Sequence, residues 1–308
     1  MLAPEMSKNP KTSPAALMQA ALRALKDGNT AAAIQHFATA RRFLPTDAGL
    51  LHSLAILYRQ ERRWAESWSA AETGLRLQPD SADCGAARAA ALGCLLLDQG
   101  AASEALFWLR QALAAQPEWP EILSQAAEAA YRSGEMTSAR SYLDRAVALE
   151  PDNRTLRMAR ATILLSQQIW MPGLQDYEYR LRPTPGLEVL RDGLHSPRWQ
   201  GEDMAGRCLL VVAEQGIGDQ IRFAGDLRDL VSLCGRLIVE CESRLVPLLA
   251  RSLPAITVAP SRQRRNGNRY VFDYGWLAEL GPVDAWIEIG SLALRLFERN
   301  LPPDRLRR

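Results

Sequence analysis

The residues best suited to chemistry form one short loop in the second half of the chain. The loop follows an apolar run at residues 208–213 and contains Glu214, Gln215, Gly216, Gly218 and Asp219. Glycines there permit a tight turn and the close approach of a ligand to the backbone. A helix that starts at this loop would offer free N–H groups to an anion. Asp219 could instead cap that helix itself and so compete with a ligand.

Alternating strands and helices must position this loop. Short apolar runs predict buried strands at residues 208–213, 237–241 and 256–259. Two amphipathic helices are predicted between them. Their inward-facing residues are Ile221, Phe223, Leu227, Leu230 and Val231 in the first helix, and Leu245, Leu248 and Leu249 in the second. This alternation predicts a parallel sheet of Rossmann type, which binds ligands at the carboxyl ends of its strands.

The overall composition excludes several other kinds of site. The five cysteines contain no C-x-x-C pair and the three histidines lie far apart, so neither a metal nor a cofactor is expected. Reduced, buried thiols are typical of a cytoplasmic protein. The net charge of +2 gives no field that would attract nucleic acid. No apolar run reaches the roughly 18 residues that a membrane span needs.

The first half of the chain contains an internal repeat. Pro45 and Pro79 lie 34 residues apart, and so do Pro117 and Pro151. Each proline follows a helical pattern and ends it, because proline cannot continue a hydrogen-bonded helix. With each proline placed at position 32, four units begin at residues 14, 48, 86 and 120.

Small residues recur at fixed positions of this register, where they let two helices approach closely. They are Ala21, Ala55, Gly93 and Ala127 at position 8, and Ala33, Ser67, Ala105 and Ala139 at position 20. The pattern resembles the tetratricopeptide repeat family across residues 14–153, and a fifth, degenerate unit begins at Arg154. The resemblance implies an α-solenoid with a concave groove.

The first helix of each repeat lines the groove in this family. The matching residues are His52, Ile56, Arg59 and Gln60 in the second repeat, and Glu121, Ser124, Glu128, Tyr131 and Arg132 in the fourth. This mixed lining suits a peptide or a helix of a protein partner better than a uniformly charged ligand.

A second set of motifs lies between the repeats and the predicted sheet. Tyr177, Glu178 and Arg180 form a Tyr-Glu-x-Arg motif, and residues 197–202 read Pro-Arg-Trp-Gln-Gly-Glu within a segment rich in proline and glycine. Together with the loop at 214–219, these motifs resemble bacterial tetratricopeptide-repeat glycosyltransferases, which are similar to the lipopolysaccharide heptosyltransferases. The resemblance extends to about residue 260 and implies a GT-B fold of two Rossmann domains.

The resemblance also implies a role for Asp219. The matching aspartate of heptosyltransferases is proposed as the general base, which deprotonates the acceptor hydroxyl as it displaces the nucleotide from a sugar. GT-B enzymes bind the nucleotide-sugar donor mainly on their second Rossmann domain, which needs about a hundred further residues. No such length follows Leu296 in this sequence, so only the acceptor-side half of the GT-B fold is expected.

These observations predict four segments and a fold class. We expect a disordered leader at residues 1–13, tetratricopeptide repeats at 14–180, a linker at 181–205 and a Rossmann-like half of a GT-B domain at 206–308. Trp276 and Trp286 are interpreted either as core residues or as an exposed docking surface. The basic segment 261–269 is interpreted as a solvated loop or as a phosphate contact.

Three functions stay open at this point. The first is a protein-binding scaffold, in which the repeats recruit a protein partner or an acceptor and the half-domain is incomplete. The second is an active glycosyltransferase that uses the donor half of a partner chain, a nucleotide-sugar enzyme. The third is a truncated, non-catalytic remnant.

Overall fold

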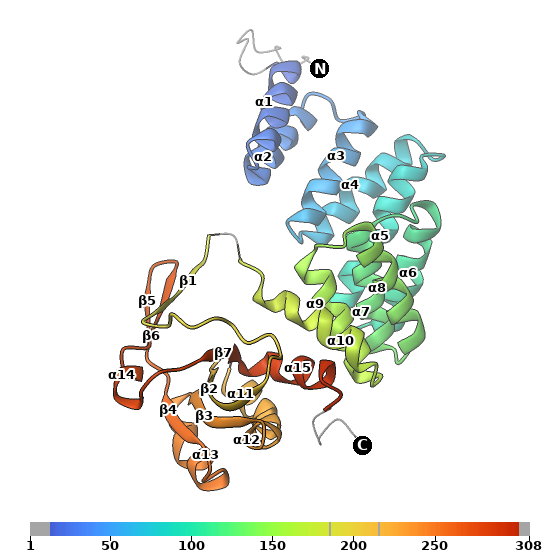
Figure 1. Cartoon of the computed structure of the whole chain (residues 1–308). Coiled ribbons are helices and arrows are strands. Elements are labelled where there is room, and N and C mark those ends of the chain that lie inside the picture. The colour runs from blue at the N-terminus through green and yellow to red at the C-terminus, as the bar shows by residue number, and fades with distance from the viewer. Residues whose placement is uncertain (1–12, 185, 215, 302–308) are drawn as a thin grey trace, which may run out of the picture. The chain divides into compact units, whose positions relative to one another are not determined.

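The structure is a computed structural model, which describes residues 13–184, 186–214 and 216–301. Gln215 and nearly all of the predicted leader lie outside the described residues. The chain divides into two compact units, residues 1–163 and 164–308, and each is described by itself. Figure 1 labels the helices and strands of both units.

The first unit is a solenoid of helices that pack as consecutive hairpins (Figure 1). Its helices are α1 (Pro14–Lys26), α2 (Thr30–Arg41), α3 (Ala48–Gln60), α4 (Trp64–Leu77), α5 (Ala82–Asp98), α6 (Ala102–Ala115), α7 (Pro120–Arg132), α8 (Met136–Leu149) and the first part of α9 (Arg154–Ser166). The predicted N-terminal α-solenoid is therefore confirmed.

The turn inside each hairpin has the same backbone geometry throughout. Gly28, Gly100 and Gly134 adopt positive φ angles of 72°, 84° and 81°. The same repeat position is held by Arg62 in the second repeat, with φ 55°, and by Gln168 in the fifth repeat, with φ 61°. Left-handed geometry costs a non-glycine residue about 1–2 kcal/mol. The packing of the hairpins therefore imposes the turn even where glycine is missing.

Close approach of neighbouring helices depends on the small residues of the repeat. A Cβ atom on Gly93 of α5 would lie 2.7 Å from Cγ of Leu109 and 3.1 Å from the carbonyl oxygen of Ala105, both on α6. Ala21, Ala55 and Ala127, at the same repeat position, are at most 2% exposed. The side chain at this position thus sets the distance between the two helices of a hairpin.

We predict that Gly93→Ala destabilises the chain by about 1–3 kcal/mol, because the added methyl group overpacks the contact with α6. Gly85 is a matched control in the same helix, since a Cβ atom there meets nothing within 4 Å. Gly85→Ala should stabilise the chain by about 0.5–1 kcal/mol, because alanine favours the helix. Urea unfolding followed by circular dichroism measures both changes. Equal effects of the two substitutions would contradict the packing argument.

The second unit contains a four-stranded parallel sheet. Its strands are β2 (Met204–Val212), β3 (Cys234–Cys241), β4 (Thr257–Pro260) and β7 (Ala285–Glu288), in the order β4-β3-β2-β7. The chain adds strands on one side of β2 and then returns to place β7 on the other side. The predicted parallel sheet is therefore confirmed, and the carboxyl ends of β2 and β7 flank its switch point.

The first predicted helix of this unit is not continuous in the structure. The first predicted helix is broken into α11 (Ile217–Phe223), a 3₁₀ turn at Ala224–Asp226 and α12 (Leu227–Val231). Ile221 was expected to face inward but is 53% exposed. It lies two residues from the buried Phe223, which places it about 200° around the helix.

The second predicted helix also differs from the expectation. Leu248 was expected to be buried but is 41% exposed, whereas Leu245 and Leu249 are buried. Leu245 belongs to a 3₁₀ turn (Ser243–Leu245), and α13 begins only after it (Val246–Ser252). The three leucines therefore do not share one α-helical stripe, and the inward prediction for Leu248 is wrong.

A second, three-stranded sheet was not predicted. It consists of β1 (Glu188–Asp192), β6 (Arg269–Asp273) and β5 (Gln263–Asn266), in the order β1-β6-β5. The linker predicted at 181–205 therefore contains a strand, and the basic segment 261–269 forms a β-hairpin rather than a loop. All four residues of β5 are exposed, so no alternating apolar pattern marks this strand in the sequence.

Three further helices complete this unit: α10 (Trp170–Tyr177), α14 (Leu277–Leu280) and α15 (Leu292–Glu298). The rings of Trp170 on α10 and Phe297 on α15 lie 6.5 Å apart. Trp276 is 7% exposed and belongs to the core beside β2 and β3, and Trp286 packs against the same core. The interpretation as a core residue is correct for Trp276, whereas Trp286 is a half-buried residue at the edge of that core.

Candidate functional sites

Glu214, the first residue of the predicted ligand loop, is held by its neighbours. Its Oε1 atom accepts hydrogen bonds from Arg180 Nη2 at 2.6 Å, from Arg180 Nε at 3.0 Å and from the backbone N–H of Gly290 at 2.9 Å. Glu214 and Gly290 follow β2 and β7, which flank the switch point of the sheet. The Tyr-Glu-x-Arg motif and the ligand loop, separate in the sequence, therefore meet at this switch point.

A second arginine and a second pair of acids extend this cluster. Glu178 accepts hydrogen bonds from Arg180 at 2.7 Å and from Arg198 at 3.0 Å, and Arg198 also donates to Glu288 at 2.7 Å. The hydroxyl of Ser291 donates to Glu178 at 2.7 Å and accepts from Arg180 at 2.7 Å. We call these residues, together with Glu214, the switch-point network.

Burial raises the pKa of both glutamates, but their net pKa shifts have opposite directions. Burial raises the pKa of Glu214 above its ordinary value, and the charge of Arg180 offsets only part of this effect. Burial also opposes ionisation of Glu178, but Arg180, Ser291 and Arg198 outweigh it and lower the pKa of Glu178. Glu214 therefore depends more strongly on its arginine for its charge.

The remaining loop residues form the start of α11. Gly216 is the N-cap residue, and no side chain caps this helix. Asp219 lies in the first turn, half-buried, and its carboxylate accepts no hydrogen bond from the described residues. Capping by Asp219, one of the two expected alternatives, is therefore not realised. Its role as a base stays a prediction.

A crevice of about 370 Å³ opens beside this loop, at the carboxyl ends of the strands. Its lining is mainly polar and consists of Ala213, Glu214, Gly216, Ile217, Gln220, Glu242, Ser243, Arg244, Ser261, Gln263 and Phe272. Gly218 and Asp219 are not among the residues that line it. Beneath it, Glu240 is 1% exposed and accepts hydrogen bonds from the N–H of Ala213 at 3.1 Å and the hydroxyl of Tyr274 at 2.9 Å.

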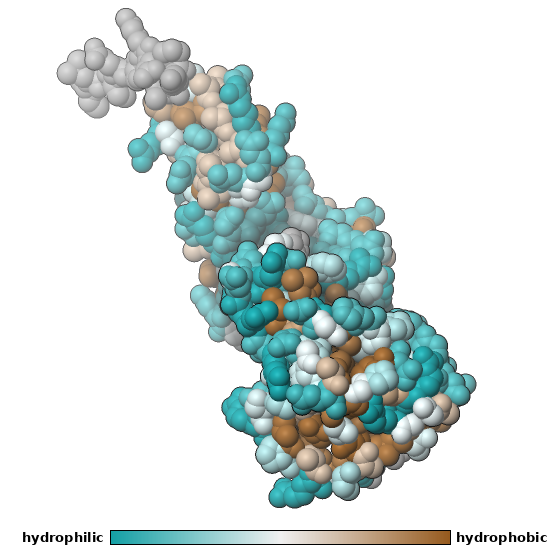
Figure 2. All heavy atoms as spheres, turned by 60° about the vertical axis from the view of Figure 1, so that its left-hand side comes forward, coloured by the Kyte–Doolittle hydropathy of each residue, from teal (hydrophilic) through white to brown (hydrophobic). Residues whose placement is uncertain are grey.

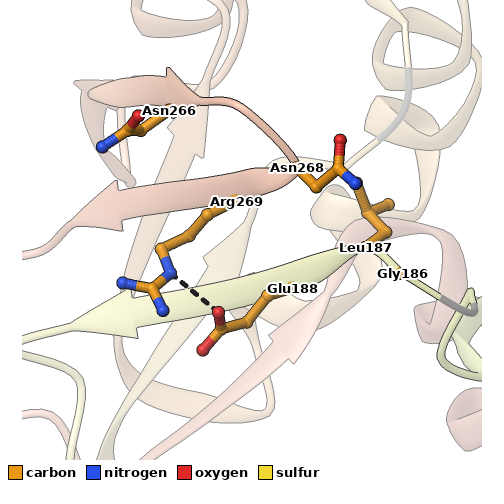
Figure 3. Close-up of a pocket in the computed structure, with 6 residues that line it drawn as sticks. All are labelled: Gly186, Leu187, Glu188, Asn266, Asn268 and Arg269. Atoms are coloured by element: carbon orange, nitrogen blue, oxygen red, sulfur yellow. Dashed lines mark hydrogen bonds and ion pairs between the residues drawn. The ribbon is translucent and has the colours of Figure 1, made fainter.

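A shallower hollow of about 530 Å³ lies over the three-stranded sheet. Figure 3 shows its lining residues Gly186, Leu187, Glu188, Asn266, Asn268 and Arg269. The side chains of Glu188 on β1 and Arg269 on β6 point toward each other, and their charged atoms are 2.7 Å apart. The two charged side chains that line this hollow are thus paired with each other.

In the repeat unit, two predicted groove residues contact each other directly. Arg59 of α3 forms an ion pair with Glu121 of α7, and its guanidinium stacks 4.5 Å from the centre of the Trp119 ring. Arg59 is only 4% exposed as a result. These two side chains, which were predicted to contact a ligand, therefore bind each other instead.

The other predicted groove residues divide into two groups. Ser124, Glu128 and Tyr131 line a cavity of about 190 Å³ between α7 and α9, while Arg132 pairs with Glu128. In the second repeat, His52 and Ile56 are half-buried and Gln60 is exposed. The Nδ1 atom of His52 is buried without a hydrogen-bond partner in the described part of the chain. The fourth repeat therefore offers the more open surface.

Comparison with known proteins agrees with this geometry. Residues 96–163, from the end of α5 into α9, match the family model of the tetratricopeptide repeat. The N-terminal unit is a solenoid of tetratricopeptide repeats. Proteins with such repeats bind protein partners, so the concave side of the solenoid is the candidate site for one.

Proteins that are similar to this chain include a curated protein and two solved structures. FlbA of Caulobacter vibrioides is 28% identical over 265 residues, which are 84% of this chain and 44% of FlbA. The tetratricopeptide-repeat protein TTC0263 of Thermus thermophilus is 22% identical, with a TM-score of 0.43, and the match covers 56% of this chain and 92% of that one. PilF of Pseudomonas aeruginosa is 19% identical, with a TM-score of 0.43, over 56% of this chain and 78% of that one.

The match to FlbA extends past the solenoid, because 84% of this chain is more than the repeats alone. The chain spans less than half of the length of FlbA. Among the described residues, no helix is long and apolar enough to cross a membrane. In the same residues, no group of three or more metal-binding side chains comes together.

We predict that Arg180→Met destabilises the second unit by about 3–5 kcal/mol at pH 7, because it leaves Glu214 as a buried charge without its arginine. Arg182→Met is the matched control, since Arg182 is exposed. The destabilisation should shrink as the pH falls towards 4.5, the ordinary pKa of a glutamate. The raised pKa lets Glu214 of the folded chain take up a proton at a higher pH than Glu214 of the unfolded chain, which removes the buried charge. Urea unfolding at several pH values measures this. A destabilisation of the same size at every pH would show that the unpaired charge of Glu214 is not its cause.

Proposed function

We propose that this chain is a protein-binding scaffold whose tetratricopeptide-repeat groove holds a segment of a protein partner. The observation that carries the proposal is the cavity between α7 and α9, with Tyr131 at its edge. Tyr131 lies on α7, the first helix of the fourth repeat, and is 44% exposed. Exposed aromatic residues beside a cavity are typical of the anchoring points of protein interfaces.

Position-specific photocrosslinking tests the scaffold proposal. We expect p-benzoylphenylalanine in place of Tyr131 to give a discrete covalent adduct in the cells that make this protein. The same group in place of Phe107 is the matched control, because Phe107 is 55% exposed but lies on α6, a second helix of its hairpin. Adducts of equal yield at both positions, or none at position 131, would exclude the groove as the binding surface.

A second function is favoured by the crevice beside the switch-point network. We propose that the sheet unit is related to the acceptor-side half of a GT-B glycosyltransferase and acts with the donor half of a nucleotide-sugar enzyme. The strand order and the contact between Arg180 and Glu214 support this, because both resemblance motifs meet at the carboxyl edge of the sheet. We propose that the protein works in the cytoplasm, because its five cysteines are unpaired and the cytoplasm keeps thiols reduced.

Calorimetric titration of the chain with nucleotide sugars tests this second function. We expect no binding to the chain alone and binding, with sugar transfer, once a donor half is present. Asp219→Asn should then abolish transfer while leaving the unfolding midpoint unchanged, because the carboxylate of Asp219 accepts no hydrogen bond from the described residues. Asp229→Asn, also on a short helix of this unit, serves as the control. Transfer that persists in Asp219→Asn would remove this residue from the mechanism.

A further inference from the structure

The cavity between α7 and α9 is small and has mostly apolar walls. Its lining residues are Ser124, Ala127, Glu128, Tyr131, Leu143, Ala159, Thr162 and Ile163. Ala127, Leu143 and Ile163 are at most 4% exposed and form part of its walls. Its volume of about 190 Å³ is below the range of about 300–1,000 Å³ that whole small-molecule ligands occupy. The cavity therefore has room for one large side chain of a ligand rather than for a complete ligand.

The charges around this cavity are already neutralised. Among the described residues that line the cavity, Glu128 is the one with a charged side chain, and it pairs with Nη2 of Arg132. The Nη1 atom of the same guanidinium donates to the carbonyl oxygen of Leu97 at 3.3 Å. Further along the groove, Glu121 pairs with Arg59. A charged ligand group would have to displace one of these partners, whereas an apolar group displaces only water. The electrostatics of the cavity thus match an uncharged side chain.

An apolar side chain would gain binding free energy on entering this cavity. Figure 2 shows a mostly hydrophilic surface on the repeat unit, interrupted by smaller apolar patches. Burying one leucine, methionine or phenylalanine side chain contributes about 1.5–3 kcal/mol to binding. The hydroxyl of Ser124 at the same cavity can bond to the backbone of an incoming peptide. The hydroxyl of Thr162 donates to the carbonyl oxygen of Met158 at 3.2 Å, so it can only accept a hydrogen bond from a peptide N–H.

We propose that this cavity is an anchor site for a peptide that inserts one leucine, methionine or phenylalanine side chain between α7 and α9. The inference rests on the proposed scaffold function and specifies the chemistry of the partner. The remainder of the peptide lies along the groove, and the Arg59–Glu121 pair limits how far it continues towards the second repeat.

Selection of random 12-residue peptides displayed on phage, with the complete chain as the target, tests the anchor site. We expect the selected peptides to share one large apolar residue, and its replacement by alanine should weaken binding about tenfold or more. Thr162→Leu should weaken binding to a similar extent, because the leucine fills the cavity. Thr137→Leu is the matched control, since Thr137 is exposed on α8 and does not line the cavity.

The possible outcomes separate the anchor site from the scaffold function. Peptides that bind near Tyr131 but share a charged residue, or that tolerate Thr162→Leu, would overturn the anchor site and retain the scaffold function. If no peptide binds the solenoid and position 131 gives no photocrosslink, both proposals are wrong. Binding that requires the apolar residue and is lost only in Thr162→Leu supports both.

Discussion

The second unit depends on one buried guanidinium, that of Arg180. A buried charge is tolerated only when it is paired and its hydrogen bonds are satisfied. Arg180 meets this requirement with Glu178, Glu214 and Ser291, which come from the turn after α10, the end of β2 and the turn after β7. Three segments far apart in the sequence are thereby fixed around the switch point of the sheet. The position of the ligand loop follows from this pairing.

The solenoid depends on a different constraint, the close approach of helices within each hairpin. Small residues permit this approach, and Gly93 is the case in which a single methyl group would already collide with the facing helix. The turn between the helices is equally constrained. Arg62 and Gln168 accept left-handed backbone angles there, which shows that helix packing outweighs the local preference of these residues.

In both candidate sites, several of the charged residues that the sequence analysis singled out are paired within the protein. Glu214 binds Arg180, Glu121 binds Arg59 and Glu128 binds Arg132. The surfaces that stay open to a ligand differ between the two units. In the solenoid it is an apolar cavity beside Tyr131, and in the sheet unit it is a polar crevice next to the loop that carries Asp219.

The sequence by itself determined the repeats and the parallel sheet, because spaced prolines, small residues and apolar runs are local signals. Exposed strands such as β5 carry no such pattern, and the sequence treated them as loop or linker. Only the tertiary structure decided which predicted site residues meet. Arg59 and Glu121 are 62 residues apart, and Arg180 and Glu214 are 34 apart. Arg59, Glu121 and Glu214 each looked available to a ligand in the sequence. Periodicity fixes the faces of each element, but the packing between elements decides which groups are left for a ligand.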